Sequence, residues 1–181
     1  MVKFSNEAAE FVYTRTYSRW IEKENRREHW DETVKRYTTF LHKHMQDKVP
    51  AKTYKKIYDS ILSFDVMPSM RSLWAAGPAA EQDNICMYNC SFQVIDNPIV
   101  FSEALYILMC GTGYGFSVEE QHVSNLPEVA QFCDERYTKK YTIEDSKRGW
   151  ANSVRLLIDS LYEGHDVEMD YSEIRPKGSL L

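Results

Sequence analysis

Hydrophobic residues in the first third of the chain recur with the period of an α-helix. One stripe is formed by Trp30, Val34, Tyr37 and Leu41. A second runs through residues 54–62, and Pro50 suits the start of its helix. We expect the helical region to end near Phe64. The pattern therefore predicts an N-terminal helical region over residues 1–66.

After about residue 67 the pattern changes to the alternation that is typical of strands. Short strands are expected at residues 86–94, 116–119, 141–143 and 167–171. Helices are expected at residues 99–110, which are apolar on nearly every side, and from about 150 to 161. Strands separated by helices favour an α/β sheet, over residues 67–181, behind the helical layer.

Composition is that of a globular protein without a membrane or export segment. The chain has 181 residues, 43% of them hydrophobic, which is enough to form a real core. No apolar run reaches the length of a membrane span, and the N-terminus lacks a signal-peptide core. Four cysteines are too few for a secreted disulfide scaffold. We expect a cytoplasmic protein with no membrane contact.

Charge argues against direct binding of nucleic acid, since the net charge is −5 at pH 7. The charge is unevenly divided: residues 1–60 hold 13 Lys or Arg against 9 Asp or Glu, a balance of +4, which leaves −9 for residues 61–181. Such a division fits an ordinary solvated helix surface, and it also fits a basic helical layer docked on something acidic.

Cysteine spacing limits the chemistry of the expected 86–94 strand. Cys86 and Cys90 would lie on one face about 13 Å apart, so they could not form a disulfide without a break in the strand. The same geometry disfavours a zinc site, and no other pair of His or Cys residues supplies the missing ligands. No metal site is predicted.

Glycines at positions 111, 113 and 115 follow the expected buried helix. Such a segment can expose backbone amides to a phosphate, but it also fits a simple turn between a helix and a strand. It has neither the ending of a P-loop nor the Rossmann spacing.

Asp96 precedes the expected helix at residue 99, where a carboxylate can cap free amides. A carboxylate at the end of a strand can equally hold a ribose hydroxyl.

Several segments, taken in order, resemble cobalamin-dependent, class II ribonucleotide reductases. They are Arg15-Thr16-Tyr17-Ser18-Arg19, Met67-Pro68-Ser69-Met70-Arg71, Asn89-Cys90, the run from Cys110 to Glu119 and Ile174-Arg175-Pro176-Lys177-Gly178. The resemblance implies a ten-stranded α/β barrel made of two half-barrels. This chain would contribute the N-terminal helices and the first strands, an incomplete barrel, with residues 141–164 as a possible inserted effector-site segment.

The resemblance also implies roles for individual residues. Cys90 matches one of two cysteines that reduce the substrate and become a disulfide. Asn89, Thr112 and Gly113 match substrate contacts, with Gly115 shaping the turn, and Asp96 matches a contact to the deoxynucleotide effector. On a continuous strand Asn89 and Cys90 would point to opposite faces, so a twist or bulge is needed for both to touch one substrate.

In the resembling family, the second redox cysteine and the radical cysteine lie in the second half of the barrel. Adenosylcobalamin would be bound mainly by that half, and a dithiol such as thioredoxin would restore the reduced state. We therefore expect an N-terminal fragment or split subunit, inactive alone, that acts on ribonucleotides with a complementary C-terminal chain. The alternative is a non-enzymatic nucleotide-binding or interaction module derived from that enzyme.

Overall fold

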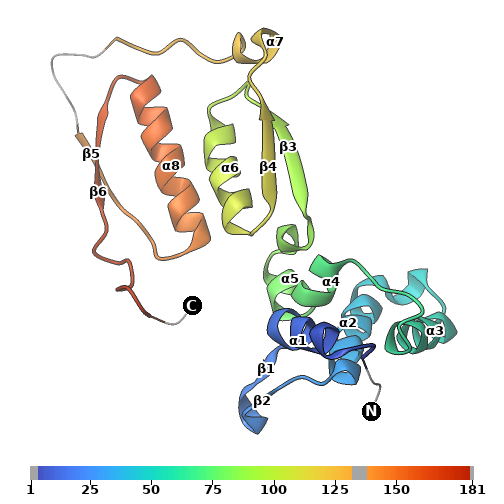
Figure 1. Cartoon of the computed structure of the whole chain (residues 1–181). Helices are drawn as coiled ribbons and strands as arrows, with labels where there is room; N and C mark the ends of the chain where they lie inside the picture. The colour runs from blue at the N-terminus through green and yellow to red at the C-terminus, as the bar shows by residue number, and fades with distance from the viewer. Residues whose placement is uncertain (1–3, 132–137, 180–181) are drawn as a thin grey trace. The chain divides into compact units, whose positions relative to one another are not determined.

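The computed structural model describes residues 4–131 and 138–179 and divides into two compact units, Met1–Tyr88 and Asn89–Leu181 (Figure 1). The division falls later than the predicted boundary after residue 66. Residues 67–88 are grouped with the N-terminal helices because they form further short helices that pack among them. Cys133 lies outside the described residues.

The first unit is mainly helical. Its elements are α1 (Glu7–Thr16), β1 (Trp20–Ile21), η1 (Glu22–Glu24), β2 (Arg26–Arg27), α2 (Trp30–Met45), η2 (Gln46–Lys48), α3 (Ala51–Leu62), α4 (Met70–Ala75), α5 (Pro78–Gln82) and η3 (Asn84–Met87). The short strands β1 and β2 pair antiparallel. The two predicted stripes form α2 and α3, and Pro50 directly precedes α3 as expected.

Two short helices after α3 were not predicted. The α3 helix ends at Leu62 and Phe64 takes a positive φ of 65°, which agrees with the expected stop. Helix resumes at α4, and α5 then begins with Pro78 in its first turn after Gly77, whose φ is 103°. The helical region therefore continues well past residue 66.

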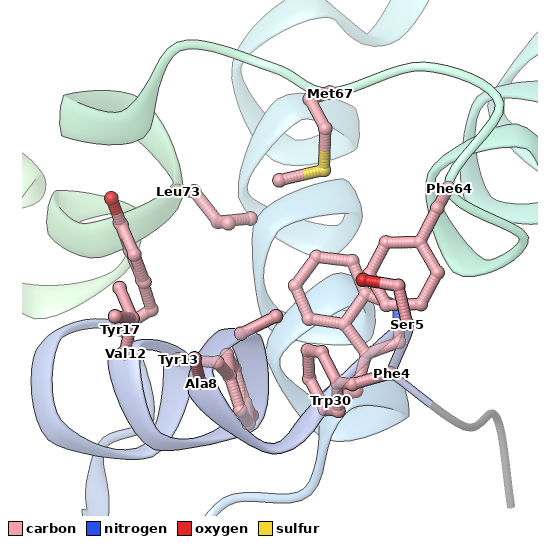
Figure 2. A pocket seen from close by; sticks show the side chains of 11 residues that line it. Phe4, Ser5, Ala8, Val12, Tyr13, Tyr17, Trp30, Phe64, Met67 and Leu73 are labelled. Carbon is pink, nitrogen blue, oxygen red and sulfur yellow. The ribbon is translucent and has the colours of Figure 1, made fainter.

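The core of the first unit is rich in aromatic side chains. Tyr13, Trp30, Val34, Ile61 and Leu73 are buried together. The Trp30 ring stacks on the ring of Phe64, two residues after α3, with centroids 4.8 Å apart. The Trp30 indole N–H donates to the Leu62 carbonyl at 3.1 Å. An apolar cavity of about 630 Å³ opens beside these side chains (Figure 2).

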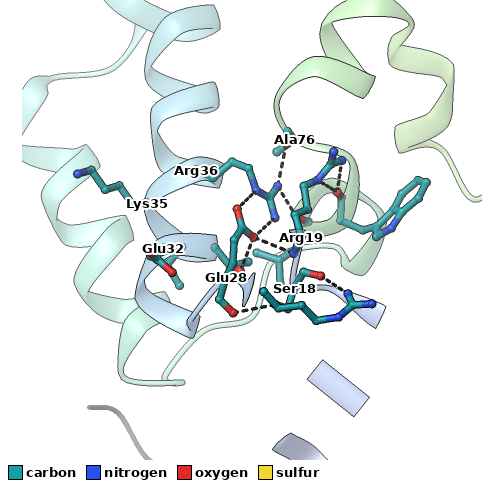
Figure 3. A network of polar contacts seen from close by, with 12 residues as sticks. Ser18, Arg19, Glu28, Glu32, Lys35, Arg36 and Ala76 are labelled. Carbon is teal, nitrogen blue, oxygen red and sulfur yellow. Dashed lines mark hydrogen bonds and ion pairs between the residues drawn. The ribbon is translucent and has the colours of Figure 1, made fainter. Parts of the chain in front are cut away.

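A polar network around Glu28 joins the β1–β2 hairpin to α2 and α4 (Figure 3). The Arg36 Nε donates to the Glu28 carboxylate at 2.8 Å, and Arg36 also donates to the Leu73 and Ala76 carbonyls at 3.1 and 2.7 Å. Both charged side chains are largely buried, at 15% and 9% exposure. Burial alone would raise the pKa of Glu28, but hydrogen bonds from Arg36 and Thr33 outweigh it and hold this pKa below its ordinary value.

The second unit alternates strands and helices, as predicted. Its elements are β3 (Cys90–Val94), α6 (Ile99–Met109), β4 (Gly113–Ser117), α7 (Glu120–Val123), β5 (Thr138–Thr142), α8 (Lys147–Tyr162) and β6 (Asp166–Asp170). Strands β3 and β4 pair in parallel, and so do β5 and β6. Helices α6 and α8 pack side by side, α6 next to β4 and α8 next to β6 (Figure 1).

Two predictions about this region are wrong. The expected strand over residues 86–94 is interrupted, because Cys86 lies in η3 and the strand begins only at Cys90. The 13 Å separation inferred for these two cysteines therefore has no basis. The expected glycine turn is also shorter than predicted, because Gly113 and Gly115 lie within β4 and Gly111 alone of these three glycines has a positive φ.

In the second unit, α6 and α8 each begin next to a side chain that caps the first turn of the helix. The Asn97 side chain accepts a hydrogen bond from the Ile99 amide at 3.0 Å, and the Ser146 side chain accepts one from the Gly149 amide at 2.9 Å. The α6 helix is less buried than expected, with Leu108 53% exposed. Across residues 4–131 and 138–179, the helices are too short or too polar to cross a membrane.

Candidate functional site

The centre of the candidate site is the thiol of Cys90, at the first residue of β3. Cys90 is exposed, in contrast to the buried Cys86 and Cys110. Its register partner on β4 is Gly113. A Cβ placed on Gly113 would come within 3.9 Å of the Cys90 sulfur and 3.2 Å of the Asn89 carbonyl oxygen. Glycine at position 113 therefore leaves room beside the thiol.

One face of the β3–β4 pair carries this site. The next register pair on the same face is Phe92 with Gly115, and Phe92 is 69% exposed. The opposite face is turned to α6, where the Gln93 amide donates to Glu103 and accepts from the Tyr114 hydroxyl at 2.9 Å. The open face thus presents a thiol, an aromatic ring and two positions without side chains.

Asn89 lies immediately before β3, so the predicted conflict between Asn89 and Cys90 does not arise. The two residues are not successive positions of one regular strand. The Asn89 carbonyl accepts a hydrogen bond from the Gly113 amide at 2.8 Å. This bond fixes the start of β4 against the start of β3.

The same bond changes the interpretation of the glycine segment. The Gly113 amide already donates to the Asn89 carbonyl, which favours the simple turn over the phosphate-binding alternative for this amide. Of the glycines at positions 111, 113 and 115, Gly111 has a positive φ, 81°, and forms the turn. Thr112, a predicted substrate contact, is only 2% exposed, and its amide donates to the Ile107 carbonyl at 3.3 Å.

Asp96 is separated from these residues by the length of β3. It is exposed and follows the carboxyl end of the strand, six positions after Cys90, which corresponds to about 20 Å. Its carboxylate makes no hydrogen bond within the described part of the chain, and Asn97, not Asp96, caps α6. The structure therefore gathers Asn89, Cys90 and Gly113 at one end of the strand pair and leaves Asp96 at the other.

Sequence reasoning missed one contact of the site. The Ser91 hydroxyl donates to the Gly113 carbonyl at 3.1 Å and ties β3 to β4 next to the thiol. A serine after the cysteine was visible in the sequence, but only the parallel pairing gives it this role. No group of three or more His, Cys, Asp or Glu side chains within residues 4–131 and 138–179 is arranged to hold a metal ion.

Comparison with known proteins places this geometry in context. Residues 1–78 match the family model described as the ribonucleotide reductase alpha domain. The adenosylcobalamin-dependent ribonucleoside-triphosphate reductase of Lactobacillus delbrueckii subsp. bulgaricus is 28% identical over 93% of this chain and 32% of its own length. The Euglena gracilis enzyme of the same name is 29% identical over 97% of this chain and 26% of its own length.

A solved structure agrees with these matches. The crystal structure of a B12-dependent, class II ribonucleotide reductase superposes with a TM-score of 0.77, at 23% identity, over 95% of this chain and 33% of that one. The predicted resemblance to class II ribonucleotide reductases is confirmed. The structural likeness also confirms the predicted fold class, helices followed by part of an α/β barrel. The chain spans about a third of the length of the Lactobacillus reductase.

Proposed function

We propose that this chain supplies part of a ribonucleotide reductase that converts ribonucleotides into 2′-deoxyribonucleotides for DNA synthesis. The observation that carries the proposal is the exposed Cys90 thiol beside Gly113, in a chain similar to the Lactobacillus reductase over 93% of its length. Cys90 is then one of two thiols that reduce the substrate.

The reaction balances with Cys90 and a second cysteine as the reductant. The substrate loses its 2′ hydroxyl as water, and the two thiols release two electrons and two protons as they form a disulfide. A dithiol such as thioredoxin then restores both thiols by exchange. Exposure of the Cys90 sulfur suits this role, because exchange requires access to the disulfide.

The open face of the β3–β4 pair suits the substrate. Gly113 and Gly115 leave the β4 backbone uncovered beside Cys90 and Phe92, so a ribose can approach the thiol closely. In this arrangement Asn89 and Gly113 contact the substrate, and the buried Thr112 supports the turn before β4. A deoxynucleotide effector at Asp96 would lie at the far end of the strand pair, with residues 141–164 as the inserted effector-site segment.

The second redox thiol and the radical cysteine are proposed to lie on a complementary C-terminal reductase chain. The chain matches 32% of the length of the Lactobacillus delbrueckii reductase. Adenosylcobalamin, which generates the radical when bound, is proposed to be held mainly by that partner. This chain alone then has no turnover.

The test is reconstitution with that C-terminal half, followed by an assay of cobalamin-dependent ribonucleotide reduction with a dithiol. Cys90→Ser should lower turnover by at least about a thousandfold while substrate binding stays nearly unchanged. Cys86→Ala is the matched control, because it removes a buried thiol from the other unit and should retain turnover. Full turnover in Cys90→Ser would refute the proposed role, and nucleotide binding with no turnover in any reconstitution would favour a binding module.

A further inference from the structure

The first unit contains a polar hollow that the proposed reductase chemistry does not use. Its volume is about 390 Å³, within the range of small-molecule sites. Arginines and tryptophans dominate its lining: Arg15, Arg19, Arg27, Trp20 and Trp74. Among its described lining residues there is no aspartate or glutamate.

Within the described residues, none of these three guanidinium groups forms an ion pair with a carboxylate. Arg19 donates to the Trp74 carbonyl at 3.2 and 2.7 Å, and Arg27 donates to the Ser18 carbonyl at 2.8 Å. Carbonyl oxygens orient these groups but carry no net charge. Within residues 4–131 and 138–179, Arg15 makes no hydrogen bond or ion pair and its side chain is exposed.

The nearest carboxylate does not supply the missing negative charge. The Glu28 carboxylate accepts a hydrogen bond from the Arg19 backbone amide at 3.2 Å and is held by two nitrogens of Arg36, at 2.8 and 3.0 Å (Figure 3). Its charge is thus matched by Arg36. Burial, and then repulsion from Arg36, lower the pKa of Arg19, and attraction to Glu28 offsets this lowering only in part. An anion in the hollow would offset it further.

We propose that this hollow binds a small organic phosphate with a planar ring, of the chemical class of a nucleoside diphosphate. Guanidinium groups match phosphate oxygens with paired, charge-assisted hydrogen bonds. The indoles of Trp20 and Trp74, 50% and 42% exposed, offer apolar faces on which a planar ring can stack. None of the residues that line the hollow belongs to the β3–β4 pair that carries Cys90.

The experiment titrates the full chain with ADP, inorganic pyrophosphate and adenosine, and measures binding by calorimetry and by quenching of tryptophan fluorescence. ADP should bind more tightly than pyrophosphate, because stacking on the indoles adds to the phosphate contacts. Adenosine should bind weakly, and added salt should weaken ADP binding.

Arg15→Gln is the decisive variant, because this exposed side chain supports nothing else in the fold. It should raise the ADP dissociation constant about tenfold or more. Arg27→Gln should act in the same direction. Arg148→Gln, which removes an exposed arginine from the other unit, is the matched control and should leave binding unchanged.

Three results would overturn the proposal. One is the absence of ADP and pyrophosphate binding at millimolar concentration, and another is ADP binding that is equal in Arg15→Gln and the parent chain. The third is binding of a glutamate-rich peptide without ADP binding, which would assign the arginines to an acidic protein partner. Arg15 and Arg27 lie in the other unit from Cys90, so weaker ADP binding in Arg15→Gln and Arg27→Gln, with turnover retained in the reconstituted reductase, separates this test from the reductase assay.

Discussion

The two units differ in how much of their hydrophobic and charged surface is buried within the unit itself. The Met1–Tyr88 unit buries Trp30, Val34 and Leu73 in one core and encloses an ion pair. The Asn89–Leu181 unit exposes Phe92 and Leu108 by more than half, and its strands form two separate parallel pairs. Parallel strands are normally covered on both faces by other structure. The first unit therefore has the better packed core, although both units expose large apolar side chains, and the second has open strand faces suited to further contacts.

This contrast agrees with the proposal that the Cys90 site is completed by a C-terminal reductase chain. The open face of β3 and β4 carries both the thiol of Cys90 and the exposed ring of Phe92. Structure that covers Phe92 would also enclose Cys90. The first unit buries a core made of its own residues, so we expect its stability not to depend on the structure that covers Phe92. The following predictions test that contrast, from the largest expected effect to the smallest.

Arg36→Met should destabilise the first unit by about 3–5 kcal/mol, because it leaves the largely buried Glu28 carboxylate without its cation. Urea unfolding followed by circular dichroism gives the loss, and hydrogen exchange assigns it to a unit. Arg155→Met is the matched control in the second unit, where the Arg155–Asp159 pair is more exposed. It should cost less than about 1 kcal/mol. Equal losses would contradict the comparison.

Leu73→Ala should cost about 2–5 kcal/mol, since Leu73 is 1% exposed in the aromatic core of the first unit. Leu108→Ala makes the same chemical change on the exposed side of α6 and should cost far less. The same urea titrations compare the two. A large loss in the Leu108 variant would mean that the second unit is already covered in solution.

Gly149→Ala should destabilise the second unit by about 1–3 kcal/mol. The added Cβ would come within 2.1 Å of the Glu144 carbonyl oxygen, so the backbone before α8 must shift. Faster hydrogen exchange in α8 is the expected signal. Asn152→Ala, on an exposed position of the same helix, should be neutral or slightly stabilising. Unchanged hydrogen exchange in α8 would show that the backbone before α8 can shift at little cost in free energy.

Acid should weaken the first unit through Glu32, with the smallest effect of the four. Hydrogen bonds from Arg26, and then from the His29 amide, lower the pKa of Glu32 to about 2. A depressed pKa stabilises the fold above the ordinary glutamate range, and this contribution is lost as pH falls from about 4.5 to about 2. Glu32→Gln should flatten thermal stability over that interval, whereas Glu7→Gln should not. A profile unchanged by Glu32→Gln would refute the assignment.

Periodicity identified the longer elements because their burial is one-sided. The stripe from Trp30 to Leu41 became α2, and the stripe that begins at Trp150 became α8. Short elements were missed where local backbone geometry decides them. The α5 helix depends on the positive φ of Gly77 followed by Pro78, and no apolar stripe marks it.

The structure brings Asn89, Cys90 and Gly113 together, and their roles in binding and redox chemistry stay predictions; the geometry around them differs from the expected continuous strand. Alternating residues from Cys86 suggested one continuous strand, but a one-turn 3-10 helix accommodates the same pattern up to Met87. The glycines looked like a turn because sequence does not show which strand lies beside them. Pairing with β3 makes Gly113 and Gly115 strand residues. A local sequence pattern does not indicate a parallel partner strand that lies more than twenty positions away.

The register of β3 against β4 makes the candidate site sensitive to chain length. Cys90 shares a face with Phe92, opposite Gly113 and Gly115, because side chains alternate along both strands. Inserting or deleting a single residue inside either strand would turn every later side chain to the other face, toward α6. Evolution can therefore exchange residues here much more freely than it can add or remove them. Related sequences should tolerate length changes in the loops around these strands, and gaps placed within them would mark either a misalignment or a lost site.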